Sequence, residues 1–185
     1  MIEYLGYIAT SLDGKIAKTD GELDWLLNPK FNLDDEDFGY KTFFDSIDCL
    51  VMGKNTFLKV LEFPEYPYGE KIVWILSKSK ITIPTNLQSY VKQHTCSISE
   101  LDEILKKDGK TKRVYVDGGR VISSYAKLGF LKKITITTIP VLIGKGISLW
   151  DLNVEETIHL NCEASQLYTN GFLKQTYSFS NNLSN

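Results

Sequence analysis

The chain has 185 residues, of which 43% are hydrophobic, and its formal net charge at pH 7 is −2. This length is enough for one domain with a sizeable core, and the balanced charge offers no basic surface of the kind that binds nucleic acid. The three cysteines lie far apart without a C-x-x-C pair and only two histidines occur, so the sequence predicts neither a disulfide framework nor a metal site.

The predicted elements begin with a strand over residues 2–9, an apolar run. A polar stretch follows to about residue 32, and connections of this length often form lids or binding loops. No apolar run is long enough for a membrane span and the N-terminus lacks a signal-peptide pattern, so we expect a cytoplasmic protein with no membrane partner. We expect one domain over residues 1–180, with residues 181–185 as a frayed polar tail.

The helix predicted over residues 34–46 has one apolar face that includes a carboxylate. The residues of this face are spaced four, three, four and three apart: Leu33, Asp37, Tyr40, Phe44 and Ile47. Asp37 is therefore expected among buried residues, where a carboxylate needs a partner or resists ionisation, and it becomes a candidate for binding a cationic heterocycle or managing a proton. The alternative is equally open: Asp37 lies in the first helical turn, stays solvated and interacts with the helix dipole.

Two strands are each predicted to enter a helix through a glycine turn. Residues 47–52 lead through Gly53 into a helix over 54–62, and residues 113–117 lead through Gly118-Gly119 into a helix over 120–128. Helix N-termini attract anions through their unpaired N–H groups and their positive dipole end. The pair of turns indicates one extended phosphate-bearing ligand, although a Gly-Gly pair by itself is also typical of a simple tight turn.

The remaining elements complete an alternation of strands and helices. Strands are predicted over 71–77, 89–92 and 133–141, a helix starts after the capping-box sequence Ser97 to Glu100, and two strands near 156–168 and 171–179 meet at Asn170-Gly171, a strong hairpin signal. We therefore predict an α/β fold with a mostly parallel central sheet flanked by helices and a C-terminal antiparallel hairpin. The ligand site is expected beyond the carboxyl ends of the central strands.

Several motifs, in order, resemble the dihydrofolate reductase superfamily over nearly the full length of the chain. Within it the chain is most similar to the C-terminal reductase domain of the bacterial bifunctional riboflavin-biosynthesis deaminase–reductase, and no zinc-binding His/Cys set of the deaminase half is present. The motifs are Ala9-x-x-Leu12-Asp13-Gly14-Lys15-Ile16-Ala17, Met52-Gly53-Lys54-x-Thr56-Phe57, Leu76-Ser77-Lys78, Gly118-Gly119 and Pro140-Val141-Leu142-Ile143-Gly144-x-Gly146.

The resemblance implies a dihydrofolate-reductase-like fold, NADPH as hydride donor, a small heterocyclic substrate and a homodimer. The glycines of the two turns would let backbone approach the pyrophosphate, Ser77 and Lys78 would face the adenosine 2′-phosphate, and the Leu12 to Ile16 loop would close over the nicotinamide. The implied cofactor-binding residues are Ala9, Leu12, Gly14, Ile16, Gly53, Lys54, Asn55, Thr56, Ser77, Lys78, Ser79, Gly118, Gly119, Arg120 and Val121.

The resemblance also implies two catalytic residues, Asp37 and Thr137. Asp37 precedes Gly53 by sixteen residues, the spacing of the superfamily's substrate-binding acid, and Thr137 resembles its substrate-side threonine. A threonine there is equally typical of any β-strand. Two features depart from true dihydrofolate reductases: Trp25 and Pro29 lie upstream of the place where a Trp-x-x-Pro pattern is expected ahead of the acid, and residues 54–62 lack the tail-binding arginine. Three functions stay open: an NADPH-dependent reductase of a pyrimidine such as the ribosylamino-pyrimidine of riboflavin synthesis, a dihydrofolate reductase proper, and a non-catalytic nucleotide-binding module.

Overall fold

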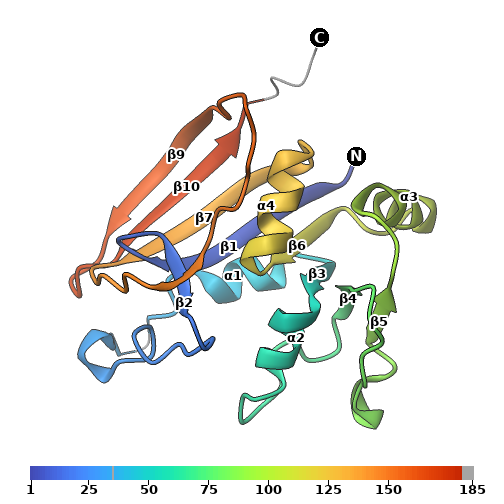
Figure 1. The fold of residues 1–185 in the computed structure, drawn as a ribbon, viewed down its shortest axis with the longest axis horizontal. Coiled ribbons are helices and arrows are strands. Elements are labelled where there is room, and N and C mark those ends of the chain that lie inside the picture. The colour runs from blue at the N-terminus through green and yellow to red at the C-terminus, as the bar shows by residue number, and fades with distance from the viewer. Residues whose placement is uncertain (35, 181–185) are drawn as a thin grey trace.

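The computed structural model describes residues 1–34 and 36–180, which are built around one eight-stranded sheet (Figure 1). The strand order is β5-β4-β3-β6-β1-β7-β10-β9. The strands of this sheet are β1 (Glu3–Ser11), β3 (Cys49–Gly53), β4 (Ile72–Leu76), β5 (Val91–His94), β6 (Arg113–Asp117), β7 (Leu131–Ile139), β9 (Leu160–Leu167) and β10 (Leu173–Phe179), and the helices are α1 (Tyr40–Asp45), α2 (Lys54–Val60), α3 (Ile98–Asp108) and α4 (Gly119–Lys127).

The six strands from β5 to β7 are parallel, whereas β10 runs antiparallel to β7 and β9 antiparallel to β10. The mostly parallel sheet with a C-terminal antiparallel hairpin is therefore confirmed. At the hairpin, Gly171 has a φ of 86° and its N–H donates to the Tyr168 carbonyl at 2.9 Å. Glycine enters this left-handed conformation without steric cost, which is why Asn170-Gly171 predicted the turn correctly.

Alternate residues of the central strands feed two hydrophobic layers, one on each face of the sheet. In β3, Val51 packs with α3 and α4, whereas Leu50 and Met52 pack with α1 and α2. All three β3 side chains are fully buried. Burial on both faces accounts for the continuous apolar sequence of this strand, because successive side chains point to opposite faces and both faces carry helices.

The helix predicted over residues 34–46 is wrong in its first half. The helix α1 begins only at Tyr40, because Phe38 and Gly39 have φ values of 58° and 83°. These left-handed conformations cannot continue a right-handed helix. The periodic spacing that included Asp37 is therefore not one helical face, and the side chain of Asp37 is exposed rather than buried.

A small second sheet was not predicted. It joins β2 (Lys15–Lys18) to β8 (Gly146–Ser148), and a Cβ placed on Gly146 would lie only 2.4 Å from the Ala17 carbonyl oxygen. Two short 3-10 helices, Pro29–Phe31 and Thr85–Leu87, were also not predicted. Among the described residues, no helix combines the length and the apolar character needed to cross a membrane. The predicted frayed tail, 181–185, lies outside the described residues.

Candidate active site

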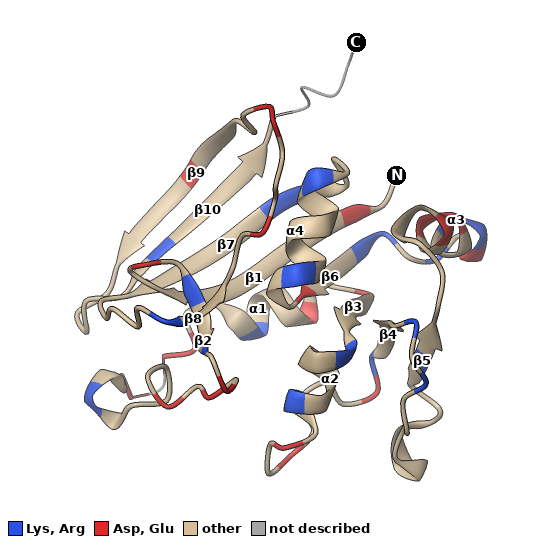
Figure 2. Ribbon diagram, in the orientation of Figure 1, with Lys and Arg blue, Asp and Glu red and all other residues tan. Residues whose placement is uncertain are grey.

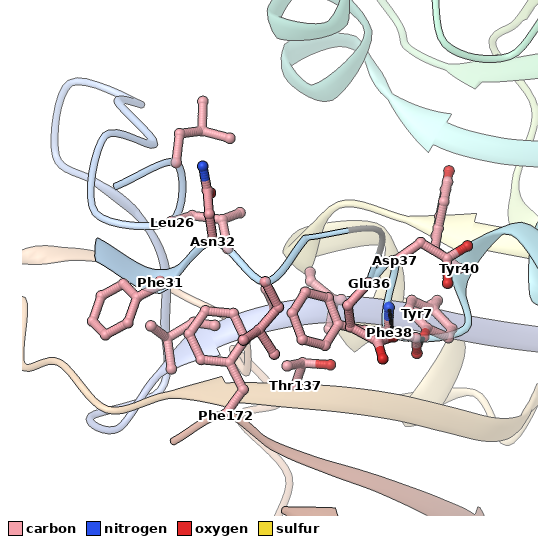
Figure 3. A pocket seen from close by; sticks show the side chains of 15 residues that line it. Tyr7, Leu26, Phe31, Asn32, Glu36, Asp37, Phe38, Tyr40, Thr137 and Phe172 are labelled. Carbon is pink, nitrogen blue, oxygen red and sulfur yellow. Dashed lines mark hydrogen bonds between the residues drawn. The ribbon is translucent and has the colours of Figure 1, made fainter. Parts of the chain in front are cut away.

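A pocket of about 360 Å³ opens at the carboxyl ends of β1 and β7 (Figure 3). Ala9 of β1 and Thr137 of β7 are register partners in the sheet and both line it. The segment before α1 and the hairpin residue Phe172 also contribute to the lining. The described lining residues are Tyr7, Ile8, Ala9, Leu26, Leu27, Phe31, Asn32, Leu33, Glu36, Asp37, Phe38, Tyr40, Thr137, Ile139 and Phe172.

Aromatic rings form much of this pocket, which we call the aromatic pocket. The Phe38 ring lies 4.8 Å from that of Tyr168 and 5.1 Å from that of Phe172, and the Phe31 ring lies 5.4 Å from that of Phe172. Flat, apolar walls of this kind suit a planar ring, because ring faces stack while water is displaced.

The backbone at the pocket wall is strained and held in place by side chains. Phe38 has a left-handed backbone conformation, which is uncommon for a residue other than glycine. Its carbonyl oxygen accepts hydrogen bonds from the Tyr7 hydroxyl at 2.5 Å and from the Lys174 ammonium at 2.8 Å. A conformation of this type costs on the order of 1–3 kcal/mol and persists only where surrounding contacts maintain it. The two donors, one on β1 and one on β10, fix the direction in which the Phe38 ring enters the pocket.

Asp37 lies at the rim of the aromatic pocket and binds the start of α1. Its carboxylate accepts hydrogen bonds from the backbone N–H groups of Lys41 and Gly39, each at 2.8 Å, and these bonds hold its pKa below the usual range. The helix-start role that the sequence left open is therefore observed, and Asp37 lines the pocket as well. An ionised carboxylate there can accept hydrogen bonds from a ligand but carries no proton to donate near pH 7.

The two glycine turns lie side by side at the same edge of the sheet. Gly53 precedes α2 and Gly118 precedes α4, and their strands β3 and β6 are paired with Met52 opposite Asp117. Gly118 has a φ of 86°, and a Cβ there would lie 2.2 Å from the Thr56 hydroxyl oxygen. The structure thus brings together the ends of α2 and α4, including Asn55 and the exposed Arg120 in their first turns.

Packing within the chain by itself requires glycine at position 119, and the predicted contact of Gly119 with the pyrophosphate stays a prediction. A Cβ at this position would lie 2.7 Å from the Ile16 side chain and 3.2 Å from the carbonyl oxygens of Ser148 and Leu149. A larger residue at position 119 would therefore clash with other parts of the chain. The opening lies at Gly53, where a Cβ would meet only Val121, at 3.4 Å.

The predicted residues after β4 lie next to the first turn of α2. The Lys54 ammonium donates to the Ser79 hydroxyl at 3.0 Å, and the Ser77 hydroxyl donates to the Ser79 carbonyl at 2.8 Å. Lys78 between the two serines is exposed. The structure therefore groups two hydroxyls and the Lys54 ammonium at the carboxyl ends of β3 and β4, with Lys78 exposed in the same segment, a suitable set for a phosphate.

Hydrogen bonds attach the loop after β1 to the segment that follows β7. The Asp13 carboxylate accepts hydrogen bonds from the Ser11 hydroxyl at 2.6 Å and from the N–H groups of Ile143 and Gly144, and these bonds lower its pKa to about 2. Gly14 follows with a φ of 72°, and its carbonyl accepts from Leu149 N–H at 3.0 Å. Leu12 is left 65% exposed at the tip of this tethered turn.

Sequence reasoning missed Asp117, which ends β6 directly before the glycine pair. Its carboxylate accepts hydrogen bonds from the Tyr68 hydroxyl at 3.0 Å and from Gly118 N–H at 2.8 Å. Burial raises the pKa of this carboxyl, and the two donors oppose that effect only in part. The position of an acid immediately before Gly-Gly was the signal available in the sequence.

Sequence reasoning also missed most of the aromatic pocket, including Tyr7, Phe38 and Phe172. These residues are far apart in the chain, so no local pattern could group them. Among the described residues, no group of three His, Cys, Asp or Glu side chains is placed to hold a metal ion.

Comparison with known proteins gives a consistent result. Residues 7–174 match the model of the family described as RibD C-terminal domain. The Bacillus subtilis protein named "Uncharacterized protein YwjB" is 33% identical over 157 residues, which cover 82% of this chain and 84% of that protein.

Among solved structures, one described as "Putative riboflavin biosynthesis protein" from Shewanella sp. PV-4 superposes with a TM-score of 0.88 at 31% identity, covering 97% of this chain and 99% of the other. The diaminohydroxyphosphoribosylaminopyrimidine deaminase/5-amino-6-(5-phosphoribosylamino)uracil reductase of Thermotoga maritima superposes with a TM-score of 0.70 at 16% identity. The match covers 97% of this chain but 57% of the Thermotoga chain, and at this identity it concerns the fold alone.

Proposed function

Because the chain belongs to the RibD C-terminal domain family, we propose that it is an NADPH-dependent reductase that transfers a hydride to a pyrimidine- or pteridine-type substrate. The main support for this proposal is that a pocket and a pair of glycine turns lie next to each other at one edge of the sheet. The aromatic pocket lies at the carboxyl ends of β1 and β7, and the paired glycine turns lie at those of β3 and β6. Parallel strands end on the same side, so a ring and a dinucleotide can meet there.

The cofactor supplies the hydride, and the residues present fit it. At the end of β3 a Cβ on Gly53 would meet only Val121, at 3.4 Å, and the first N–H groups of α2 lack helical partners and favour an anion. Lys54, Ser77, Lys78 and Ser79 form the polar group that would hold the 2′-phosphate found in NADPH and not in NADH. These residues select and orient the cofactor rather than take part in bond changes.

The aromatic pocket would orient the substrate. Its rings stack on the substrate ring and exclude water, while the buried Thr137 and the rim carboxylate Asp37 supply hydrogen-bonding groups. The low pKa of Asp37 makes it a hydrogen-bond acceptor for an amino group or a ring N–H. The proton that accompanies hydride transfer would then come from water rather than from this carboxyl.

The experiment is a fluorescence titration of the purified protein with NADPH and with NADH. We expect NADPH to bind more than tenfold more tightly, because a charge-assisted hydrogen bond to phosphate contributes roughly 1.5–3 kcal/mol. Lys78→Ala should remove much of this preference, since Lys78 is exposed beside the Ser77–Ser79 group.

The control variant is Lys127→Ala, which removes a lysine from the far end of α4. It should keep the preference of the unaltered protein. Equal affinity for the two nucleotides in the unaltered protein would contradict the assignment of a 2′-phosphate site after β4. NADPH oxidation with pyrimidine substrates then tests the reductase activity itself.

A further inference from the structure

The lining of the aromatic pocket is acidic and lacks cations. Glu36 and Asp37 both line it, on consecutive positions of the segment before α1, and the described lining includes no Lys, Arg or His (Figure 3). Protein sites for phosphate esters normally use Arg or Lys side chains, or free N–H groups at a helix start. The aromatic pocket offers its ligand the opposite charge.

The lysines nearest to the pocket do not change this balance. The Lys174 ammonium donates to the Phe38 carbonyl at 2.8 Å and lies 5.5 Å from the centre of the Tyr168 ring. Its charge also contributes to the lowered pKa of Asp37, so beside the pocket this one ammonium group stands against two carboxylates, those of Glu36 and Asp37. Lys41 pairs with Asp45 at 2.6 Å, and Lys30 lies over the Phe31 ring at 5.7 Å. Figure 2 shows basic residues dispersed along the chain rather than gathered at this segment.

The helix start beside the pocket is also occupied. The N–H groups of Gly39 and Lys41 are the donors that an anion would meet at the beginning of α1, and both already donate to the Asp37 carboxylate. The N–H of Phe38 donates to the Glu36 carboxylate at 2.6 Å. A phosphate group here would have to displace a carboxylate of the chain from its own hydrogen bonds.

Building on the proposed reductase function, we infer that the substrate is a planar, amino-bearing heterocycle that is neutral or cationic and carries no phosphate ester. Amino groups on the ring would donate to Asp37 and Glu36, and the ring would stack against the aromatic walls. A phosphate dianion placed in the same pocket would meet two carboxylates and one ammonium group, a net negative charge that disfavours it. The substrate would therefore differ from the phosphoribosyl compound named for the Thermotoga reductase.

The test uses two compounds that differ only in the phosphate: 5-amino-6-(5-phosphoribosylamino)uracil and the same compound without its phosphate. Binding of each is measured by calorimetry in the presence of saturating NADP⁺, so that no reduction occurs. We expect the compound without phosphate to bind at least tenfold more tightly. Equal or tighter binding of the phosphorylated compound would overturn the inference, and so would failure of both compounds to bind.

A matched pair of variants tests the cause. The double variant Glu36→Gln, Asp37→Asn removes both charges and keeps one carbonyl acceptor at each position, although the introduced asparagine can accept only one of the two N–H bonds that Asp37 accepts. It should bind the phosphorylated compound more tightly and reduce the discrimination at least threefold, with an unchanged circular dichroism spectrum as the check that the segment stays folded. Glu65→Gln removes an exposed carboxylate outside the pocket lining and should leave the discrimination unchanged. A discrimination that is the same in the double variant and in the unaltered protein would show that the two carboxylates are not its cause.

Turnover separates this inference from the proposed function. If the compound without phosphate binds preferentially but neither compound supports NADPH oxidation, the proposed reduction of these pyrimidines fails and the inference about charge stands. If both compounds are reduced and the phosphorylated one is preferred in binding and in kcat/KM, the reductase function stands and the inference fails.

Discussion

Gly53 and Gly118 begin neighbouring helices, yet an added methyl group should have different effects at the two positions. A Cβ at Gly53 makes ordinary contact with Val121 at 3.4 Å, so Gly53→Ala should fold normally and lose at least tenfold in NADPH affinity if the cofactor approaches this backbone. Gly118 has a φ of 86° and no room beside Thr56. Gly118→Ala should therefore lower the free energy of unfolding by roughly 1–3 kcal/mol. Urea denaturation and NADPH titration of both variants check this, and unchanged affinity in Gly53→Ala would contradict the cofactor placement.

The carboxyl of Asp117 should make stability depend on pH in a predictable direction. Burial raises its pKa above the ordinary value of 3.8, so the folded state favours the protonated form. Below pH 3.8 the carboxyl is protonated in both states and does not lower the free energy of unfolding. As pH rises from 3.8 through the raised pKa, the free energy of unfolding falls, because the folded state must ionise a buried carboxyl. Asp117→Asn cannot ionise, so its free energy of unfolding relative to the unaltered protein should rise between pH 4 and pH 7. Urea denaturation across this range is the measurement, and a difference independent of pH would contradict the assignment.

At the scale of elements, the start of α3 shows the most complete local signal. The Ser97 hydroxyl accepts from Glu100 N–H at 3.2 Å and the Glu100 carboxylate accepts from Ser97 N–H at 2.8 Å, which confirms the predicted capping box. Ser97→Ala should lower the free energy of unfolding by about 1 kcal/mol. Ser99→Ala, at an exposed position two residues further along the chain, should change the free energy of unfolding little. Equal effects of the two substitutions in thermal or urea denaturation would mean that the cap is not what stabilises this helix.

The start of α1 shows the opposite case. The apolar residues before and within α1 have helical spacing from Leu33 onward. The chain nevertheless adopts left-handed conformations at Phe38 and Gly39. The hydrogen bonds that hold this bend come from Tyr7 on β1 and Lys174 on β10. Periodicity reports which residues could share a face, but contacts with distant strands decided the backbone here.

At the scale of the whole molecule, the homodimer implied by the family resemblance remains a prediction. The strand β9 ends the sheet, all eight of its residues are exposed, and Leu167 is 74% exposed. An exposed edge strand can pair with another chain. We expect light scattering to give twice the 21.0 kDa of one chain. Leu167→Glu should weaken association, whereas Leu128→Glu, at an exposed site after α4, should not. A monomer at micromolar concentration would contradict the prediction.

The sequence by itself determined the order of the α-helices and of the strands of the main sheet, its parallel part with the closing hairpin, and the glycine turns at the ends of β3 and β6. These features depend on side-chain periodicity, glycine conformations and capping, which act within a few residues. Only the tertiary structure decided that Gly119 packs against Ile16, that Asp37 is exposed and bound to the start of α1, and that burial raises the pKa of Asp117. It also decided the aromatic pocket. Each of these depends on what lies opposite a residue in space, and packing brings those groups together from distant parts of the chain.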